Sequence, residues 1–221
     1  MSEPVAQAAS LREVVPGVFR CHIQDERVDA PSESYAVAGA GGVVLVDPLP
    51  MSPRARASLE KLAGERGIAA ICLTASHHQR CAWRYRDQFG ARVHAPQGAR
   101  GLERSADHTF RDGDQLPGGL LALRSPGPSE SHYAFLLPKS SVLFCGDLLC
   151  NIDRAGTRFI VSDEHKDPAA TRESVRKLLD RDFRVICFAH GEPVTRGARR
   201  AILAALRRDA ASPAGGRRVA R

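Results

Sequence analysis

A buried strand that runs directly into a histidine-containing turn is the feature that most limits how this chain can fold. Residues 71–82 read ICLTASHHQRCA, and the apolar run 69–73 is followed at once by Thr74 and further polar side chains. A short apolar run with polar flanks is typical of a strand inside a sheet. The sequence therefore predicts a sheet whose edge presents a cluster of polar groups.

Length and composition are those of one large globular domain. The chain has 221 residues, of which 43% are hydrophobic and 26% are charged, and this length is sufficient to bury a substantial core. No apolar run reaches the length of about 18 residues that a membrane span requires, and residues 1–12 lack a secretory signal pattern. Six cysteines without a C-x-x-C pair suit a reducing compartment. We therefore expect a cytoplasmic protein with no membrane partner.

The net charge of +7 comes entirely from the C-terminal end of the chain. Residues 196–221 hold eight Arg and one Asp, whereas residues 1–195 hold 24 basic and 24 acidic side chains. A balanced body is not the basic surface that nucleic-acid binding requires. We predict one domain over residues 1–206 and a basic, disordered tail over residues 207–221. We expect no nucleic-acid contact beyond a weak one through this tail.

Apolar runs separated by turn signals predict a strand-rich chain with a few helices. The glycine cluster at residues 40–42 precedes a strand, so it predicts a hairpin turn and not a dinucleotide-binding loop. Strands are expected at residues 18–23, 35–38, 43–46, 69–73, 92–95, 120–123, 133–137, 142–145 and 185–189. Helices are expected at residues 53–66, 83–89, 168–179 and 198–206. Strand-rich blocks followed by helices indicate two sheets packed together with helices outside.

Five short motifs occur in order between residues 14 and 206. They are VVLVD at 43–47, TASHHQR at 74–80, SPGP at 125–128, LFCGD at 143–147 and AHGEP at 189–193. Together they resemble the metallo-β-lactamase superfamily, which has a strand ending in Asp, an H-x-H-x-D-H motif, a T-P-G-H turn, a strand ending in Gly-Asp and a terminal H-G-x-P. The resemblance implies an α+β fold, a four-layer αββα sandwich of two mixed β-sheets flanked by helices.

The resemblance also implies a metal site, because intact members hold two Zn²⁺ ions at these motifs. Three of the implied ligand positions keep a ligand type in this chain, namely His77, Asp147 and His190. The other implied ligand positions hold Ala75, Gln79, Arg80 and Pro128. Asp147 would bridge the two metals, and Asp47 would support the site. Because a structural or catalytic zinc ion needs three or four protein ligands, we predict a dismantled two-zinc site without standard dinuclear zinc hydrolase activity.

Arg80 suggests how such a site could exist without any cofactor. A guanidinium is always charged and makes forked hydrogen bonds to carboxylates. A buried Asp147 without a nearby cation would be costly or would become protonated. We therefore predict that Arg80 pairs with Asp147, with the two groups within about 4 Å of each other. The positive charge of Arg80 would also repel a metal ion.

A competing hypothesis keeps a single metal ion. His77, Asp147 and His190 form a two-His, one-carboxylate set that suits one Zn or Fe ion. Glu130 or His78 could add a fourth contact. Under this hypothesis the chain hydrolyses small esters, lactones or thioesters, with His77, His78 and His190 as acid–base groups.

The alternative to an enzyme is a binding or regulatory protein that reuses the scaffold for a small-molecule ligand. An enzyme predicts an open pocket at the strand ends, whereas a non-catalytic protein predicts that Arg80 and Asp147 close it. β-Lactam hydrolysis is not expected, because it relies on a zinc-bound hydroxide. Two further histidines receive structural interpretations: His78 is predicted at a polar rim, and His132 at the surface or hydrogen-bonded in a strand.

Overall fold

Seven strands form the first sheet, in the order β1-β2-β3-β4-β5-β6-β7. The computed structural model describes residues 3–153, 155–160 and 166–211. In chain order the strands are Arg12–Val15, Val18–Asp25, Ala30–Gly39, Gly42–Val46, Ile68–Cys72, Arg92–Pro96 and His108–Phe110. Strands β1 to β4 pair antiparallel, and β4 to β7 pair parallel. The β3–β4 hairpin closes with Gly39 opposite Gly42, which confirms the turn predicted at residues 40–42.

Five strands form the second sheet, in the order β14-β11-β10-β9-β8. They are β8 Gln115–Leu116, β9 Leu120–Arg124, β10 Tyr133–Leu137, β11 Val142–Phe144 and β14 Val185–Cys187. Strands β11 and β14 are parallel, and the other neighbours are antiparallel. A separate pair consists of β12 Leu149–Cys150 and β13 Arg158–Phe159. Both large sheets therefore contain a parallel strand pair, and these pairs position the polar residues described below.

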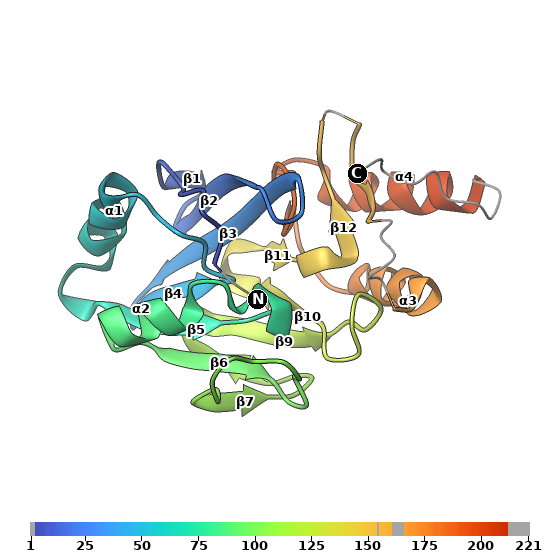
Figure 1. Cartoon of the computed structure of the whole chain (residues 1–221). Coiled ribbons are helices and arrows are strands. Elements are labelled where there is room, and N and C mark those ends of the chain that lie inside the picture. The colour runs from blue at the N-terminus through green and yellow to red at the C-terminus, as the bar shows by residue number, and fades with distance from the viewer. Residues whose placement is uncertain (1–2, 154, 161–165, 212–221) are drawn as a thin grey trace.

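The described residues include four α-helices, which lie outside the two sheets (Figure 1). They are α1 Pro53–Ala63, α2 Ala82–Phe89, α3 Pro168–Leu178 and α4 Ala198–Ala211. Short 3₁₀ helices are η1 Gly64–Arg66, η2 Ser76–Gln79, η3 Pro117–Gly119, η4 Pro138–Ser140 and η5 Gly146–Leu148. Helices α1 and α3 begin alike, because the side chains of Ser52 and Asp167 accept the amides of Ala55 and Ala170, and a proline follows each cap.

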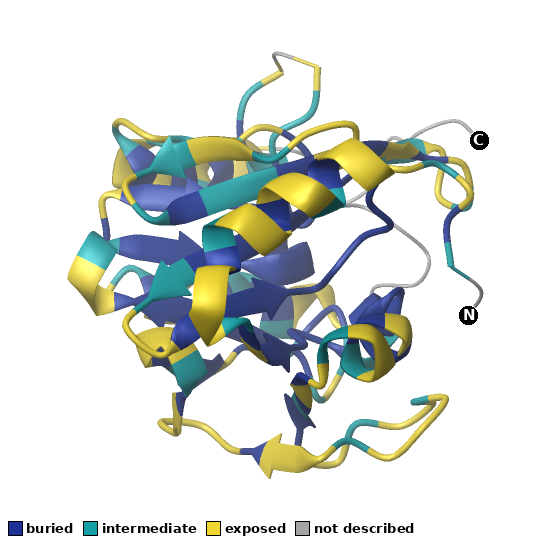
Figure 2. Cartoon of the chain, turned by 90° about the vertical axis from the view of Figure 1, so that its left-hand side faces the viewer, coloured by how far each residue is buried: buried dark blue, intermediate teal, exposed yellow. Residues whose placement is uncertain are grey.

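Three apolar clusters separate four layers of structure. Leu45 on β4 belongs to the cluster that packs the first sheet against α1 and α2, whereas its neighbours Val44 and Val46 belong to the cluster between the two sheets. Leu143 on β11 belongs to the cluster that packs the second sheet against α3 and α4. This alternation follows from the two-residue period of a strand. Figure 2 shows the result, with buried strands inside and exposed outer faces on the helices.

The predicted α+β architecture, a four-layer αββα sandwich, is confirmed. The two sheets and their flanking helices follow the expected order along the chain. The predicted end of the last helix at residue 206 is wrong, because α4 continues to Ala211. Arg172 and Asp209 form an ion pair that fixes this last part of α4 to α3, with N–O distances of 2.5 and 2.9 Å. The rest of the predicted tail, residues 212–221, lies outside the described residues.

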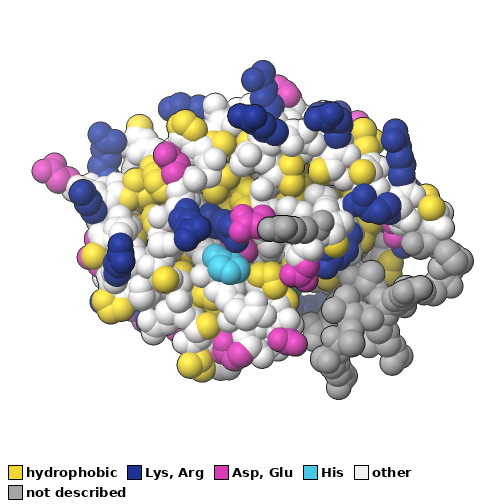
Figure 3. Space-filling view, turned by 90° about the horizontal axis from the view of Figure 1, so that it is seen from above, with side chains coloured by type: hydrophobic (Ala, Val, Ile, Leu, Met, Phe, Trp, Pro, Cys, Tyr) yellow, Lys and Arg dark blue, Asp and Glu magenta, His cyan; other side chains and the backbone are white. Residues whose placement is uncertain are grey.

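Lys and Arg side chains are scattered over the face seen from above, between uncharged and acidic ones (Figure 3). Among the residues that the structure describes, no helix combines the length and apolar character that crossing a bilayer would require.

Candidate functional site

Four strand ends bring the predicted site residues to one edge of the sandwich. In the first sheet, parallel strands β4 and β5 run into Asp47 and into the η2 turn that carries His77 and His78. In the second sheet, parallel strands β11 and β14 run into Asp147 and His190. Residues at the carboxyl ends of parallel strands meet at the same sheet edge, where ligand sites of α/β proteins commonly lie.

Asp147 lies at the centre of this cluster. Its Oδ2 accepts a hydrogen bond of 2.7 Å from His77 Nε2 and lies 3.2 Å from His78 Nε2. Its Oδ1 lies 3.5 Å from His190 Nε2, and this buried oxygen has no hydrogen-bond partner among the described residues. Burial alone would raise the pKa of Asp147, but His78, His190 and His77 hold it well below its usual range. Asp147 is therefore an ionised carboxylate approached by three imidazoles.

His78 connects Asp147 with a second buried carboxylate. Its Nδ1 lies 2.7 Å from Thr74 Oγ1 and 3.1 Å from Asp47 Oδ2. Thr74 also contacts Asp47 twice, through its amide at 2.8 Å and its hydroxyl at 2.6 Å. The His78 side chain is only 2% exposed. The result is a buried series of contacts that runs from Asp47 through His78 to Asp147.

The hydrogen-bond geometry defines the protonation of His78. Carboxylates only accept, so the Thr74 hydroxyl donates its single proton to Asp47, and His78 Nδ1 must donate to the Thr74 oxygen. His78 Nε2 faces a carboxylate as well and must also donate. Burial opposes the charged form, but Asp147 and Asp47 outweigh it and raise the pKa of His78 to about 9. His78 is therefore an imidazolium between two carboxylates.

His132 holds the main chain at Asp147 in place. It is fully buried, and its Nε2 accepts the main-chain amide of Asp147 at 3.1 Å. Its Nδ1 donates to the Ser125 carbonyl oxygen at 2.9 Å. Burial lowers the pKa of His132 to about 4, so this histidine is neutral and acts as an acceptor. Of the two interpretations offered for His132, the hydrogen-bonded one is confirmed and the surface one is wrong.

His190 presents one ring nitrogen to the site. Its Nδ1 donates to the Pro31 carbonyl oxygen at 2.8 Å, and this bond fixes the ring so that Nε2 faces Asp147 Oδ1. The side chain of His190 is 17% exposed and that of His77 is 35% exposed. These two histidines are the parts of the cluster that solvent or a ligand can reach.

The predicted pair between Arg80 and Asp147 is wrong. Arg80 is buried, but its Nη1 donates to the main-chain oxygens of Glu33 and Asp47, at 3.3 and 3.4 Å. No ion pair of 4.0 Å or shorter joins its guanidinium to a carboxylate among the described residues. The Arg80 backbone has a φ of 28° and ends the η2 turn. This backbone direction takes the side chain toward main-chain carbonyls and not toward Asp147.

Gln79 also faces away from Asp147. Its side chain is buried, donates to the Gly101 carbonyl oxygen at 3.0 Å and accepts the indole N–H of Trp83 at 2.8 Å and the Glu103 amide at 2.7 Å. It therefore anchors the 101–103 segment to α2. Glu130, which the sequence offered as an added ligand, is exposed, and its carbonyl oxygen accepts Arg124 at 3.3 Å.

The rim position predicted for His78 is wrong, because the η2 turn places it inside. A 3₁₀ helix has three residues per turn, so neighbouring His77 and His78 point in directions about 120° apart, and both still reach Asp147. Their rings lie 4.3 Å apart in an edge-on arrangement. The sequence carried a signal for this role in the adjacent histidines and in the Asp47 and Thr74 groups that could fix one of them.

The cluster resembles a nucleophile–base–acid triad only in its residue types. Thr74, His78 and Asp147 are in contact, but the Thr74 hydroxyl donates to Asp47 and the residue is 1% exposed. A substrate therefore has no access to the hydroxyl. The reachable acid–base groups are the partly exposed His77 and His190.

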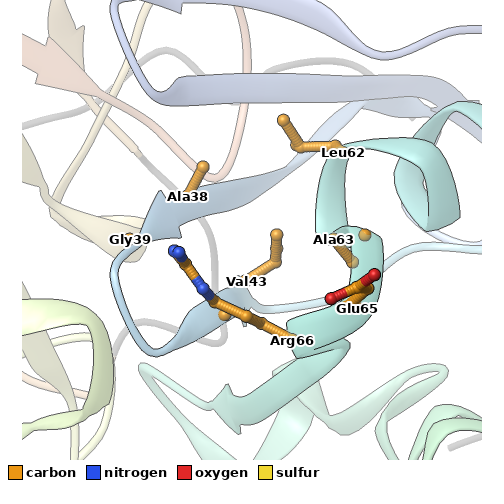
Figure 4. A pocket seen from close by; sticks show the side chains of 9 residues that line it. Ala38, Gly39, Val43, Leu62, Ala63, Glu65 and Arg66 are labelled. Atoms are coloured by element: carbon orange, nitrogen blue, oxygen red, sulfur yellow. The ribbon is translucent and has the colours of Figure 1, made fainter.

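The two described cavities lie away from this cluster. One, of about 290 Å³, lies between the β3–β4 turn and the end of α1, where Leu62 and Ala63 face Ala38 and Val43 (Figure 4). It adjoins the start of β4, whereas Asp47 follows the end of β4. The other is lined by charged side chains of α2 and of the 104–107 segment. Neither contains a residue of the cluster.

The cluster contains one set of three close potential metal ligands among the described residues. Ligand atoms of His77, His78 and Asp147 all lie within 4.8 Å of one another. His190 Nε2 and Asp147 Oδ1 are 3.5 Å apart, and two ligands of a tetrahedral zinc ion lie about 3.3 Å apart. Donor atoms for one ion are therefore close together, while the side chains of Gln79 and Arg80 contact other groups.

The chain is thus an αββα sandwich that carries a cluster of polar residues at the ends of its strands. The family model described as metallo-beta-lactamase superfamily matches residues 15–202. The chain belongs to this superfamily. No curated protein sequence matches the chain.

Solved structures are similar in fold. The DIM-1 metallo-beta-lactamase exposed to ceftazidime is 19% identical, with 93% of this chain and 100% of that chain covered and a TM-score of 0.72. The family protein TTHA1429 from Thermus thermophilus is 21% identical, with 90% and 81% covered and a TM-score of 0.66. The superfamily protein ST1585 from Sulfolobus tokodaii is 16% identical, with 85% and 84% covered and a TM-score of 0.67. At these identities the similarity concerns the fold alone.

Proposed function

We propose that this chain uses the metallo-β-lactamase fold without the two-zinc hydrolase chemistry of the superfamily. The observation that carries the proposal is the state of Asp147, whose Oδ2 is already held by His77 and His78. The residues at the other implied ligand positions support it, since Ala75 and Pro128 have no donor atom and Gln79 is engaged elsewhere. A site without the full ligand set supplies no metal-bound hydroxide.

We favour a function in which the chain binds a small molecule without a metal ion, in a non-catalytic or metal-independent role. His77 and His190 are the side chains that such a ligand would contact, because they are the exposed members of the cluster. The buried carboxylates and His78 would then form the rigid, buried part of the site. Six free, buried cysteines fit a reducing, cytoplasmic location.

A second candidate function is a hydrolase of small esters, lactones or thioesters with one Zn or Fe ion. One specific observation favours it: Asp147 Oδ1 is buried without a hydrogen-bond partner among the described residues and faces His190 Nε2. Because His190 Nδ1 is the donor to Pro31, its Nε2 carries a lone pair when the ring is neutral. A cation could bind between these two acceptors, with His77 as a third ligand. Two observations argue against it. His77 already contacts Asp147 at short range, and the buried positive charge of Arg80 would repel a metal ion.

The deciding experiment is the metal content of tag-free protein, by elemental mass spectrometry. The protein is measured as purified and again after incubation with zinc, iron and manganese followed by desalting. We expect far less than one ion per chain in every sample, and no hydrolysis of a panel of esters, lactones, thioesters and β-lactams. About one retained ion that is lost in His190→Ala would establish the one-metal candidate, and about two ions would contradict both functions.

A further inference from the structure

We infer that His78 is a positioning residue that joins the two buried carboxylates of this site, Asp47 and Asp147, and so links the two sheets at the edge where the implied metal ligands lie. This inference rests on the proposed function, because a metal ion at Asp147 would compete for the same carboxylate. His78 occupies a spacer position of the H-x-H-x-D-H frame, so the frame itself assigns it no role.

The first argument is that His78 connects different layers of the fold. Asp47 follows β4 of the first sheet, and Asp147 follows β11 of the second sheet. His78 Nδ1 reaches Asp47 at 3.1 Å and Thr74 at 2.7 Å, while Nε2 reaches Asp147 at 3.2 Å. Both ring nitrogens are therefore engaged, one on each side of the interface between the sheets.

The second argument is that the other cationic side chains nearby do not make this connection. Arg80 donates to main-chain oxygens, and none of its contacts is a carboxylate. His77 contacts Asp147 but not Asp47, and its side chain is 35% exposed. Buried carboxylates need charged hydrogen-bond donors, because desolvation without them is costly. Among the described residues, only the His78 ring lies within 3.2 Å of both carboxylates.

The third argument is that the Asp147 segment is held too tightly to move away from His78. Its amide donates to the buried His132, and a Cβ at Gly146 would lie 2.4 Å from His132 Nε2. Asp47 is held equally closely by the Thr74 amide and hydroxyl. Both carboxylates are therefore fixed, and the distance between them suits one imidazole ring.

NMR of the wild-type protein tests this inference directly. Uniformly ¹⁵N-labelled protein is studied at pH 7 with long-range nitrogen–proton correlation spectra, assigned with His78→Gln. Two slowly exchanging ring protons on His78 are expected, one on Nδ1 and one on Nε2, in the presence of EDTA and equally after zinc is added. His77, with its partly exposed ring, provides the internal comparison. A His78 ring with only one protected proton in the EDTA sample would overturn the inference.

Stability measurements give a second, independent test. His78→Ala leaves two buried carboxylates without the imidazole between them, a loss that corresponds to a melting temperature lower by about 10 °C. His77→Ala removes a donor from the same oxygen at a partly exposed position, and we expect a decrease of at most about 3 °C. Equal decreases for the two variants would contradict the inference. If His78→Ala does not fold, the NMR experiment on the wild type decides.

The outcomes separate this inference from the proposed function. Retained metal together with two protected His78 protons would contradict the metal-free function and support the role of His78. No retained metal together with a single protected proton on His78 would support the metal-free function and contradict the role of His78. Loss of the Nε2 proton on addition of zinc, with one ion bound per chain, would contradict both.

Discussion

The main-chain amide of Asp147 donates to the Nε2 of buried His132 over 3.1 Å. The residue before Asp147 is consequently in tight contact with the same ring, because a Cβ at Gly146 would lie 2.4 Å from that nitrogen. Gly146 also has a φ of 56°, a conformation that glycine adopts without strain. The position of the segment that carries Asp147 therefore depends on His132 and Gly146, neither of which is an implied metal ligand.

Gly146→Ala tests this dependence. The added Cβ must displace His132, so we expect the free energy of unfolding to fall by about 3 kcal/mol or more. Gly90→Ala is the matched control, since Gly90 has a φ of 66° and a Cβ added there would meet no atom of the described residues within 4 Å, and we expect a loss of about 1 kcal/mol. Urea unfolding measures both values. Similar losses would show that His132 yields easily.

Thr74→Val probes the contact between Asp47 and His78. The substitution keeps the shape of the side chain and removes the hydroxyl that lies 2.6 Å from Asp47 and 2.7 Å from His78. We expect a loss of about 3 kcal/mol, because two bonds to charged groups disappear from a buried position. Thr157→Val is the control: the Thr157 hydroxyl is buried and has no hydrogen-bond partner among the described residues, so its removal should cost almost nothing. Chemical denaturation that ranks the two variants in the opposite order would contradict this prediction.

Restoring the missing ligand types should create a metal site on this backbone. We expect a variant with Ala75→His, Gln79→Asp, Arg80→His and Pro128→His to bind zinc or cobalt at up to about two ions per chain. The wild-type protein, treated in parallel, provides the baseline, and circular dichroism checks that the variant folds. Visible absorption of the cobalt form reports the coordination. A folded variant that binds no more metal than the wild type would show that the surrounding backbone no longer fits the ions.

His94 offers a test of electrostatics outside the cluster. Burial and the neighbouring His108, whose ring centroid lies 4.7 Å away, lower the pKa of His94 to about 4 from an ordinary 6.5. The unfolded chain therefore binds this proton more readily than the folded one, and His94 removes stability as the pH falls from about 6.5 toward 4. An NMR titration should find His94 still neutral at pH 5, and His108→Gln should raise its pKa. A wild-type midpoint above 6 would contradict the prediction.

The fold could be predicted from the sequence because its longer strands and helices carry clear patterns. The β3–β4 hairpin appears at the predicted glycine turn, and helices α1 and α3 begin at the predicted residues 53 and 168. The short strands β1, β7, β8, β12 and β13 were not predicted, because they have only two to four residues and, unlike the equally short β11 and β14, do not lie in long apolar runs. Local sequence also did not reveal the pairing partners that define such strands.

The site was predicted in its position but not in its contacts. His77, Asp147 and His190 do meet at the strand ends, as the order of the motifs indicated. The directions of His78 and Arg80 could not be predicted, because they depend on the η2 turn and on the positive φ of Arg80. In a 3₁₀ turn, successive side chains point about 120° apart, so a residue expected at the surface can point into the protein. This rotation brought His78 inside and took the Arg80 guanidinium away from Asp147.

The connection from Asp47 through His78 to Asp147 has a consequence for the motions of the whole molecule. Its two ends are attached to different sheets, so the sheets cannot slide past each other at this edge while it is intact. If one sheet unfolded alone, the buried charged groups attached to the other sheet would become exposed. Separate unfolding of the two sheets is therefore unfavourable. We therefore expect the two sheets to unfold together in a single cooperative transition.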